Sequence, residues 1–259
     1  MLTGSFARKG YDWWWHSFTA HHAVTKEEKG FYIEFFLCNP KLGGKEPILG
    51  QLPYNQQNHI HPSYLMVNVG CWGENKKQLH RFFGWNDVVV NKGAPYSVSA
   101  DDCYASETEL KGHVCVKDAE QHPEYMCDNG EMSFNLKIKK QIAFNVGYGT
   151  DKLFTGIKAF EMYWHAEGMK STYEGEIILD GEKYIVTPET SYGYADKNWG
   201  RNFTSPWVWL SSNNLVSNIT HKKLENSVFD IGGGRPKIFN LPWERKLLGA
   251  FYYEGEEYE

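Results

Sequence analysis

The run YGYADKNWGRNFTSPWVWLSSN, from Tyr192 to Asn213, shapes the expectations for the whole chain. It places an acid, a base and an amide side by side, Asp196, Lys197 and Asn198, among three tryptophans. Tryptophan has a large apolar face and one N–H donor, so such a run suits a partly dry aromatic cavity that takes a hydrophobic ligand. Charged groups are costly among aromatic rings unless they have a partner or a role, which favours a site.

A strand is expected after Pro206 in the same run. Because side chains alternate along a strand, Trp207 and Trp209 should share one face, with Val208 and Leu210 on the other. A core strand that is entered through a tight turn has the same pattern. Core packing therefore stays open as an interpretation of the tryptophans.

Length and composition define a broad class. The 259 residues are 41% hydrophobic, 16% aromatic and 23% charged, which is typical of a globular protein with one large β domain or two smaller ones. The formal net charge is -5 and no basic run is present, which argues against nucleic acid as a partner.

Targeting segments and metal-ligand motifs are not apparent. The N-terminus has no apolar leader and no stretch of about twenty apolar residues follows, so a cytoplasmic protein without an integral membrane segment is expected. Its aromatic content would still permit peripheral membrane contact. The five cysteines are odd in number and lack a C-x-x-C pair, which fits reduced thiols. His59 and His61 have metal-like spacing without a third ligand, so no metal site is expected.

Short strands separated by turn residues run along the chain. Two strands are expected within Asp12–Asn39, joined by a hairpin around Thr25–Gly30, and Glu174–Val186 should form a hairpin that turns at Asp180 and Gly181. Gly232 to Gly234 favour a flexible loop, and a bare-backbone cradle for a ligand is the alternative. Further strands are expected at Tyr64–Trp72, Gln78–Val90, Tyr96–Ala100, Glu107–Val116, Met132–Ile138, Phe160–Met169, Ser227–Ile231 and Lys246–Tyr253.

Two of these strands carry further titratable groups. Glu34 lies in the middle of an aromatic strand, and it either faces solvent or enters a cavity as an acid. His165 and Glu167 are two residues apart and so share one face of their strand.

The tryptophan-rich run also carries an ordered motif: a tyrosine, K-N-W-G, a turn with Phe that ends in proline, then W-x-W and an asparagine. Its residues are Tyr194, Lys197, Asn198, Trp199, Gly200, Phe203, Pro206, Trp207, Trp209 and Asn213. In order and spacing the motif resembles that of the tocopherol cyclase family and the related carotenoid-hydratase-like lipocalin folds. An N-terminal signature agrees more loosely: Tyr11, Asp12, Trp14 and Trp15 match, and Trp13 replaces the family's glycine.

This resemblance implies an all-β fold of two lipocalin-like antiparallel β-barrel or sandwich domains, the second one incomplete or trimmed in this chain. The expected division is an N-terminal β domain at residues 1–158 and a partial C-terminal β domain at residues 159–259, which carries the K-N-W-G motif. The ligand cavity is expected at or near the junction of the two domains.

The resemblance also implies chemistry without a cofactor. An acid protonates an isoprenoid double bond, and a phenol oxygen or water captures the tertiary carbocation. Aromatic faces attract such a cation, and a carboxyl group walled by aromatics holds a proton near neutral pH. The candidate acids are Asp196 and Glu34, and His165 is the candidate for orienting or deprotonating the attacking hydroxyl. The candidate substrate-binding residues are Trp14, Trp15, Tyr194, Lys197, Asn198, Trp199, Trp207, Trp209 and Asn213.

Three functional hypotheses follow from these residues. The first is a cofactor-independent cyclase, hydratase or isomerase that acts on a hydrophobic isoprenoid or related substrate. The second is a lipocalin-like carrier that binds a hydrophobic small molecule without changing it. The third is a structural latch between domains, in which Lys197, Asn198 and Trp199 satisfy buried groups.

Overall fold

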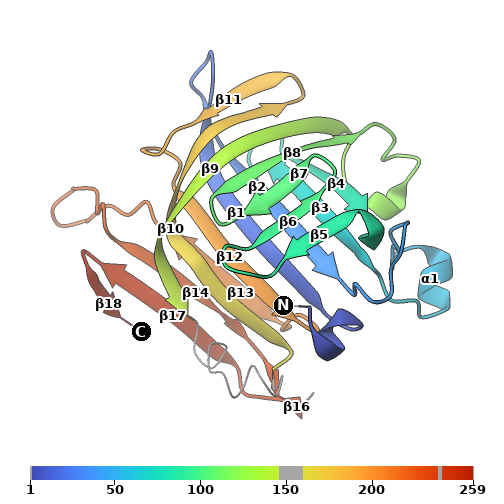
Figure 1. Cartoon of the computed structure of the whole chain (residues 1–259). Coiled ribbons are helices and arrows are strands. Elements are labelled where there is room, and N and C mark those ends of the chain that lie inside the picture. The colour runs from blue at the N-terminus through green and yellow to red at the C-terminus, as the bar shows by residue number, and fades with distance from the viewer. Residues whose placement is uncertain (1, 146–159, 239–240, 259) are drawn as a thin grey trace.

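A computed structural model describes residues 2–145, 160–238 and 241–258 (Figure 1). Within these residues, most of the chain forms one twelve-stranded sheet in the order β4-β3-β2-β1-β11-β10-β9-β8-β7-β6-β5, with β12 inserted between β1 and β10. All pairings are antiparallel. The strands are β1 (Tyr11–His22), β2 (Glu28–Cys38), β3 (Tyr64–Cys71), β4 (Lys77–Phe83), β5 (Val88–Asn91), β6 (Ser97–Ala100), β7 (Cys103–Ser106), β8 (Glu109–Val116), β9 (Gly130–Asn145), β10 (Met162–Leu179), β11 (Glu182–Val186) and β12 (Gly193–Gly200).

A second, four-stranded sheet has the order β13-β14-β17-β18 and lies beside β10 and β12 (Figure 1). Its strands are β13 (Trp207–Ser212), β14 (Val228–Gly234), β17 (Lys246–Tyr253) and β18 (Glu256–Tyr258). The remaining described elements are short: strands β15 (Lys237–Ile238) and β16 (Leu241–Pro242), helix α1 (Pro53–Gln57) and single 3-10 turns η1 (Gly4–Ala7), η2 (Trp85–Asp87) and η3 (Pro123–Tyr125).

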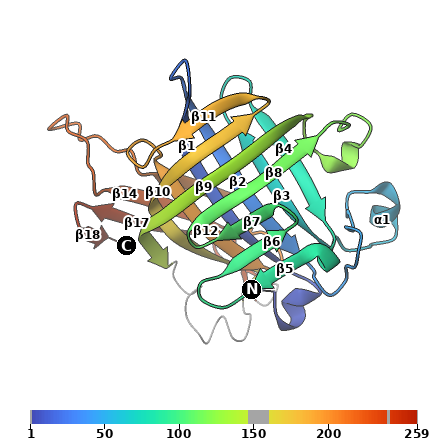
Figure 2. The same cartoon turned by 45° about the horizontal axis from the view of Figure 1, so that its top comes forward.

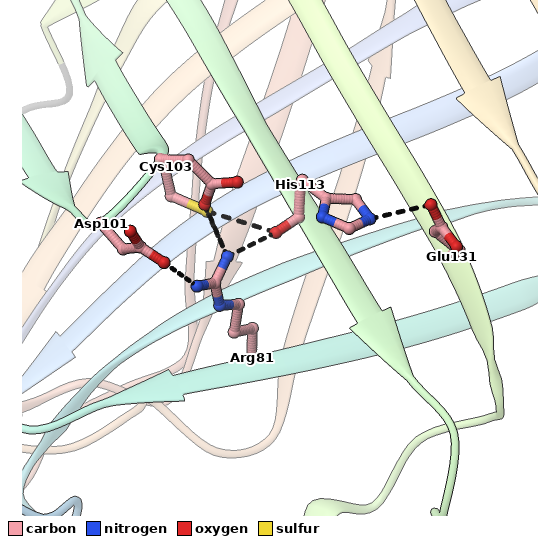
Figure 3. A network of polar contacts seen from close by, with 6 residues as sticks. Arg81, Asp101, Cys103, His113 and Glu131 are labelled. Carbon is pink, nitrogen blue, oxygen red and sulfur yellow. Dashed lines mark hydrogen bonds and ion pairs between the residues drawn. The ribbon is translucent and has the colours of Figure 1, made fainter.

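The large sheet curls until β4 approaches β8, as seen where β8 and β9 cross β2 and β3 in Figure 2. Side-chain contacts hold β4 against β8. Arg81 on β4 donates to the His113 carbonyl oxygen on β8 at 2.8 Å, and it pairs with Asp101 and Asp102 in the β6–β7 turn (Figure 3). The curled sheet thus forms a barrel whose closing seam is held by an arginine.

The inside of the barrel is the main hydrophobic core. On β2, Ile33, Phe35 and Leu37 are fully buried, and they pack in one cluster with Leu110 on β8 and Leu136 on β9. Strand alternation turns the intervening side chains of β2 to the outer face of the sheet. A smaller core, which includes Met169, Tyr194 and Val228, fills the space between that outer face and the second sheet.

The all-β, lipocalin-like architecture expected from the sequence is confirmed. The hairpin between β10 and β11 turns at Asp180 (φ 50°) and Gly181 (φ 88°), as expected for a two-residue turn. Four details differ. β10 runs without a break from Met162 to Leu179, where one strand ending at Met169 and a second beginning near Glu174 were expected. A short strand at Cys103–Ser106 was not expected, β9 is longer than Met132–Ile138, and η2 interrupts the strand expected at Gln78–Val90.

The triple glycine was expected to form a loop, and this expectation is wrong. Gly232, Gly233 and Gly234 lie inside β14 and pair with both β13 and β17. Close packing explains the residue type, because a Cβ at Gly232 would lie 2.7 Å from the Trp164 ring. Glycine here makes room for a neighbouring indole.

The large sheet continues across the expected domain division at residue 158. β10, β11 and β12 come after that point, yet they pair with β9 and β1 in the same sheet. The change from the first sheet to the second comes between Gly200 and Trp207, within the tryptophan-rich run. The run therefore belongs to both sheets, and the division into two folding units stays a prediction.

Candidate functional site

β12 positions the polar residues of the K-N-W-G motif by strand alternation. Asp196 and Asn198 face outward, opposite Trp15 and Trp13 of β1 respectively, whereas Lys197 faces the barrel interior opposite Trp14. The neighbours Asp196 and Lys197 therefore lie on opposite faces of the sheet, and they do not form an ion pair with each other.

A cavity of about 300 Å³ lies between the outer face of β1, β10 and β12 and the second sheet. Six aromatic side chains dominate its wall, and the polar side chains that reach it are an acid, an amide and a hydroxyl. The lining residues are Trp13, Trp15, Met162, Trp164, Asp196, Asn198, Phe203, Thr204, Trp207, Val208, Trp209, Gly232 and Gly233. Such a cavity suits an apolar ligand with one reactive or polar group.

Asp196 is the buried carboxyl group of this cavity. Its Oδ2 accepts a hydrogen bond from Trp164 Nε1 at 2.8 Å and lies 3.3 Å from Asn198 Nδ2 and 3.4 Å from the Tyr194 hydroxyl. Its Oδ1 is 3.4 Å from Trp13 Nε1. Burial raises the pKa of Asp196 to about 8, with a further upward push from Asp230, and the indole donors only partly offset this rise. At neutral pH Asp196 is therefore predominantly a carboxylic acid.

A second acid reaches the same network from β14. The Tyr194 hydroxyl donates to Asp230 Oδ2 at 2.8 Å, and Trp209 Nε1 donates to Asp230 Oδ1 at 2.8 Å. Burial raises the pKa of Asp230 to about 6, against the effect of these two donors. The Tyr194 hydroxyl thus lies between two carboxyl groups, one on each sheet.

Comparisons with known proteins show the family to which this chain is related. A family model described as tocopherol cyclase-like matches residues 96–259, which include β12, β13 and β14. The chain belongs to the tocopherol cyclase-like family. A search of curated proteins found no significant match.

Two solved structures resemble the whole fold of this tocopherol cyclase-like chain. One is CghA with Sch210972, at a TM-score of 0.50 and 10% identity, covering 96% of this chain and 59% of the CghA chain. The other is an AttH protein from Nitrosomonas europaea, at a TM-score of 0.47 and 13% identity, covering 96% of this chain and 67% of that one. At these identities the likeness to CghA concerns the fold.

Glu34 shares the outer face of the sheet with Asp196 but does not line the cavity. Glu34 lies on β2, and Trp15 of β1 lies between it and Asp196 of β12. Its Oε2 accepts a hydrogen bond from Asn68 Nδ2 at 2.7 Å. Burial raises the pKa of Glu34 to about 7. The indole of Trp15, which stacks on Tyr32, separates the two acids.

His165 lies apart from both acids. Its position on β10 is opposite Lys197, so its ring faces the barrel interior while the neighbouring Trp164 faces the cavity. Burial lowers the pKa of His165, which keeps the ring neutral. The expected trio of Asp196, Glu34 and His165 is therefore not assembled in one cavity, because alternation sends His165 to the other face.

Three other expected binding residues also face the barrel interior. Lys197 pairs with the buried Asp12, and its Nζ lies 3.5 Å from the centre of the Trp14 ring. Trp199 stacks on Tyr163 at 5.5 Å. The buried ammonium group of Lys197 is thus held by the Asp12 carboxylate and the face of the Trp14 indole. This is a structural arrangement.

Asn213 holds the end of the motif in place. Its Nδ2 donates to the Met169 carbonyl oxygen at 3.0 Å and to the Gly193 carbonyl oxygen at 2.7 Å. It thereby ties the chain after β13 to β10 and β12. The latch between domains was considered for Lys197, Asn198 and Trp199, but Lys197 pairs with Asp12 within the large sheet and Asn198 lines the cavity. Of the motif residues, Asn213 is the one whose side chain ties the segment after β13 to the large sheet.

Three side chains of the cavity and its network were not among the expected site residues. Trp164 and Phe203 line the cavity, and Asp230 pairs with Tyr194. Trp164 could have been found from alternation, since it must face away from His165. Asp230 lies between apolar residues in the run VFDIGGG, a pattern that marks a buried acid only when its partner strand is known.

Among the described residues, one cluster of side chains offers metal-ligand chemistry, and it lies on β8 and β9, away from the cavity lining. No described helix has the length and apolar character required to cross a membrane.

Proposed function

We propose that the protein is a cofactor-independent enzyme that protonates a carbon–carbon double bond of a hydrophobic, isoprenoid-type substrate and directs the resulting cation to cyclisation or hydration. The observation that carries this proposal is a carboxylic acid, Asp196, in a cavity walled by aromatic rings. Family membership supports the same reaction class.

The chemistry balances without an external reagent. The Asp196 carboxyl group gives its proton to one carbon of the double bond, and the positive charge develops on the more substituted carbon. Trp13, Trp15 and Trp164 offer indole faces that attract this cation by about 0.5–2 kcal/mol each. A substrate hydroxyl or water then forms the new C–O bond and releases a proton, which returns to the Asp196 carboxylate. Net turnover is an isomerisation or a hydration.

The groups around Asp196 have supporting roles. The indole N–H groups of Trp164 and Trp13 stabilise the carboxylate after it gives up its proton. Asn198 orients the same carboxyl group, and Tyr194 links it to Asp230. Glu34 and His165 have no part in the step because neither lines the cavity.

A carrier remains the second candidate, and one specific observation favours it. Each oxygen of Asp196 already has a donor from the protein within 3.4 Å, so its acceptor positions are occupied without a substrate. A carrier would use the same aromatic cavity to hold a lipid or quinone unchanged.

The change Asp196→Asn separates the two candidates. With a prenylated hydroquinone as probe, we expect turnover to fall by about 10²–10⁴-fold, because the general acid is lost while the shape of the cavity is kept. Binding, followed by quenching of tryptophan fluorescence, should change little. Incubation of the wild type in D₂O should place deuterium on the protonated carbon.

Asp87→Asn is the matched control, because Asp87 is exposed and lies outside the cavity. A probe that binds to the wild type and is recovered unchanged, with no deuterium in it, would favour the carrier. Equal turnover by the wild type and Asp196→Asn would remove Asp196 as the acid.

A further inference from the structure

Three side chains with metal-ligand chemistry meet on the outer face of the barrel. His113 and Cys115 are two residues apart on β8, so strand alternation places both on one face. Glu131 on β9 is the direct cross-strand partner of Cys115, which places its carboxylate on that same face. An imidazole, a thiol and a carboxylate therefore form a triangle over two adjacent strands.

The distances within this triangle are near those of a metal centre. The ligand atoms all lie within 4.8 Å of one another, and His113 Nε2 is 3.0 Å from Glu131 Oε1 (Figure 3). Tetrahedral bonds to nitrogen, oxygen and sulfur place donor atoms about 3.3–3.8 Å apart. The upper limit of 4.8 Å exceeds this spacing by about 1 Å.

The backbone at His113 is held by a hydrogen bond from the neighbouring strand β4. Arg81 donates to the His113 carbonyl oxygen, which ties this point of β8 to β4 across the closing seam. The positive charge of Arg81 is matched by Asp101 and Asp102 (Figure 3), so it does not by itself repel a cation at the triangle. His113 and Cys115 are partly exposed and Glu131 is exposed, so an ion can enter from solvent.

We propose that His113, Cys115 and Glu131 form a binding site for Zn²⁺ or a similar thiophilic divalent cation, with water as the fourth ligand. The thiol of Cys115 gives up its proton when the metal–sulfur bond forms. The bound ion joins β8 to β9 next to the closing seam of the barrel. Its role is to stabilise the fold, separate from the cavity between the two sheets.

Cobalt titration of the metal-free protein tests the site. Co²⁺ bound by a thiolate gives an intense sulfur-to-cobalt charge-transfer band, which Zn²⁺ should abolish by displacement. We expect a saturable band at one equivalent, loss of the band in Cys115→Ser, and at least tenfold weaker binding in His113→Ala. With Zn²⁺ at tenfold its Kd, the Tm should rise by about 3–6 °C.

Two variants serve as matched controls, and both should keep the band. Cys127→Ser removes another partly buried thiol, and the double change of His59 and His61 to alanine removes two exposed histidines. No saturable band in the wild type, or the same band in Cys115→Ser, would overturn the proposal. All of these positions are at least partly exposed, so circular dichroism of each variant should match the wild type.

Discussion

The two adjacent residues Asp196 and Lys197 show how much one position along a strand changes the role of a charged group. Asp196 faces an aromatic cavity and its pKa is raised by burial, whereas Lys197 faces the barrel core and is paired with Asp12. Their opposite orientations prevent the ion pair that would keep Asp196 ionised. The acid can therefore hold its proton at neutral pH.

The pH dependence of turnover follows from this protonation state. Since the proposed step requires the acid form and the pKa of Asp196 is raised to about 8, kcat/KM should fall as the pH rises through about 8. The negative charge of Asp230 contributes to the raised pKa, so Asp230→Asn should move this alkaline limb to lower pH. Measuring kcat/KM against pH for both proteins checks this. An unmoved limb in Asp230→Asn would show that the two acids are not coupled.

Glycines of β14 lie beside the cavity, where a side chain would meet neighbouring groups. Gly232 and Gly233 line the cavity, and the Trp164 indole occupies the space above Gly232. Trp164 in turn donates to Asp196, so Gly232 of one sheet leaves room for the indole that contacts the acid of the other. The glycine run of β14 is thus part of the site's construction.

The change Gly232→Ala tests this construction. The added methyl group would lie 2.7 Å from the Trp164 ring, so the indole must shift and its hydrogen bond to Asp196 should weaken. We expect a loss of about 1–3 kcal/mol in the free energy of unfolding and weaker binding of a prenylated hydroquinone. Urea unfolding and fluorescence titration measure the two effects.

Gly44→Ala is the control for this variant, because a Cβ at Gly44 has no heavy atom within 4 Å. It should match the wild type in both measurements. If Gly232→Ala also matched the wild type, Trp164 would have room to move, and the glycines would have no part in positioning Asp196.

At the scale of the whole molecule, the contact between the two sheets buries acids that water would otherwise ionise. Burial there raises the pKa values of Asp196 and Asp230 to about 8 and 6. Glu34, which is buried away from this cavity beside Asn68, has its pKa raised to about 7. An acid with a raised pKa in the folded state keeps a proton that the unfolded chain has lost. Its contribution to stability therefore falls as the pH rises from the unfolded pKa to the folded pKa.

The free energy of unfolding should accordingly decrease up to about pH 8, where Asp196 loses its proton in the folded state too, by up to about 1.4 kcal/mol per pH unit for one proton. The histidines with lowered pKa values, His16 and His165 among them, oppose this decrease only near and below their unfolded pKa of 6.5, so the slope is measured above about pH 7.5, where they are mostly neutral in both states. Asp196→Asn should flatten this decrease because Asn does not titrate. Urea unfolding at several pH values measures it, and equal slopes in the two proteins would contradict the raised pKa.

The sequence by itself determined the all-β class, the hairpin at Asp180 and Gly181, and the importance of the K-N-W-G run. These depend on local signals: alternation, turn residues with positive φ, and a motif of fixed spacing. The tryptophan density of Tyr192–Asn213 marked the right segment for the cavity.

Only the tertiary structure decided which residues meet. Asp230 and Trp164 come from strands far apart in the sequence, and their contacts with the network around Asp196 depend on how the second sheet packs on the first. His165 and Glu34 were grouped with Asp196 by chemistry, but strand orientation and the ring of Trp15 keep them apart from it. The physical reason is that a side chain's direction follows from local geometry, whereas its neighbours follow from long-range register and sheet packing.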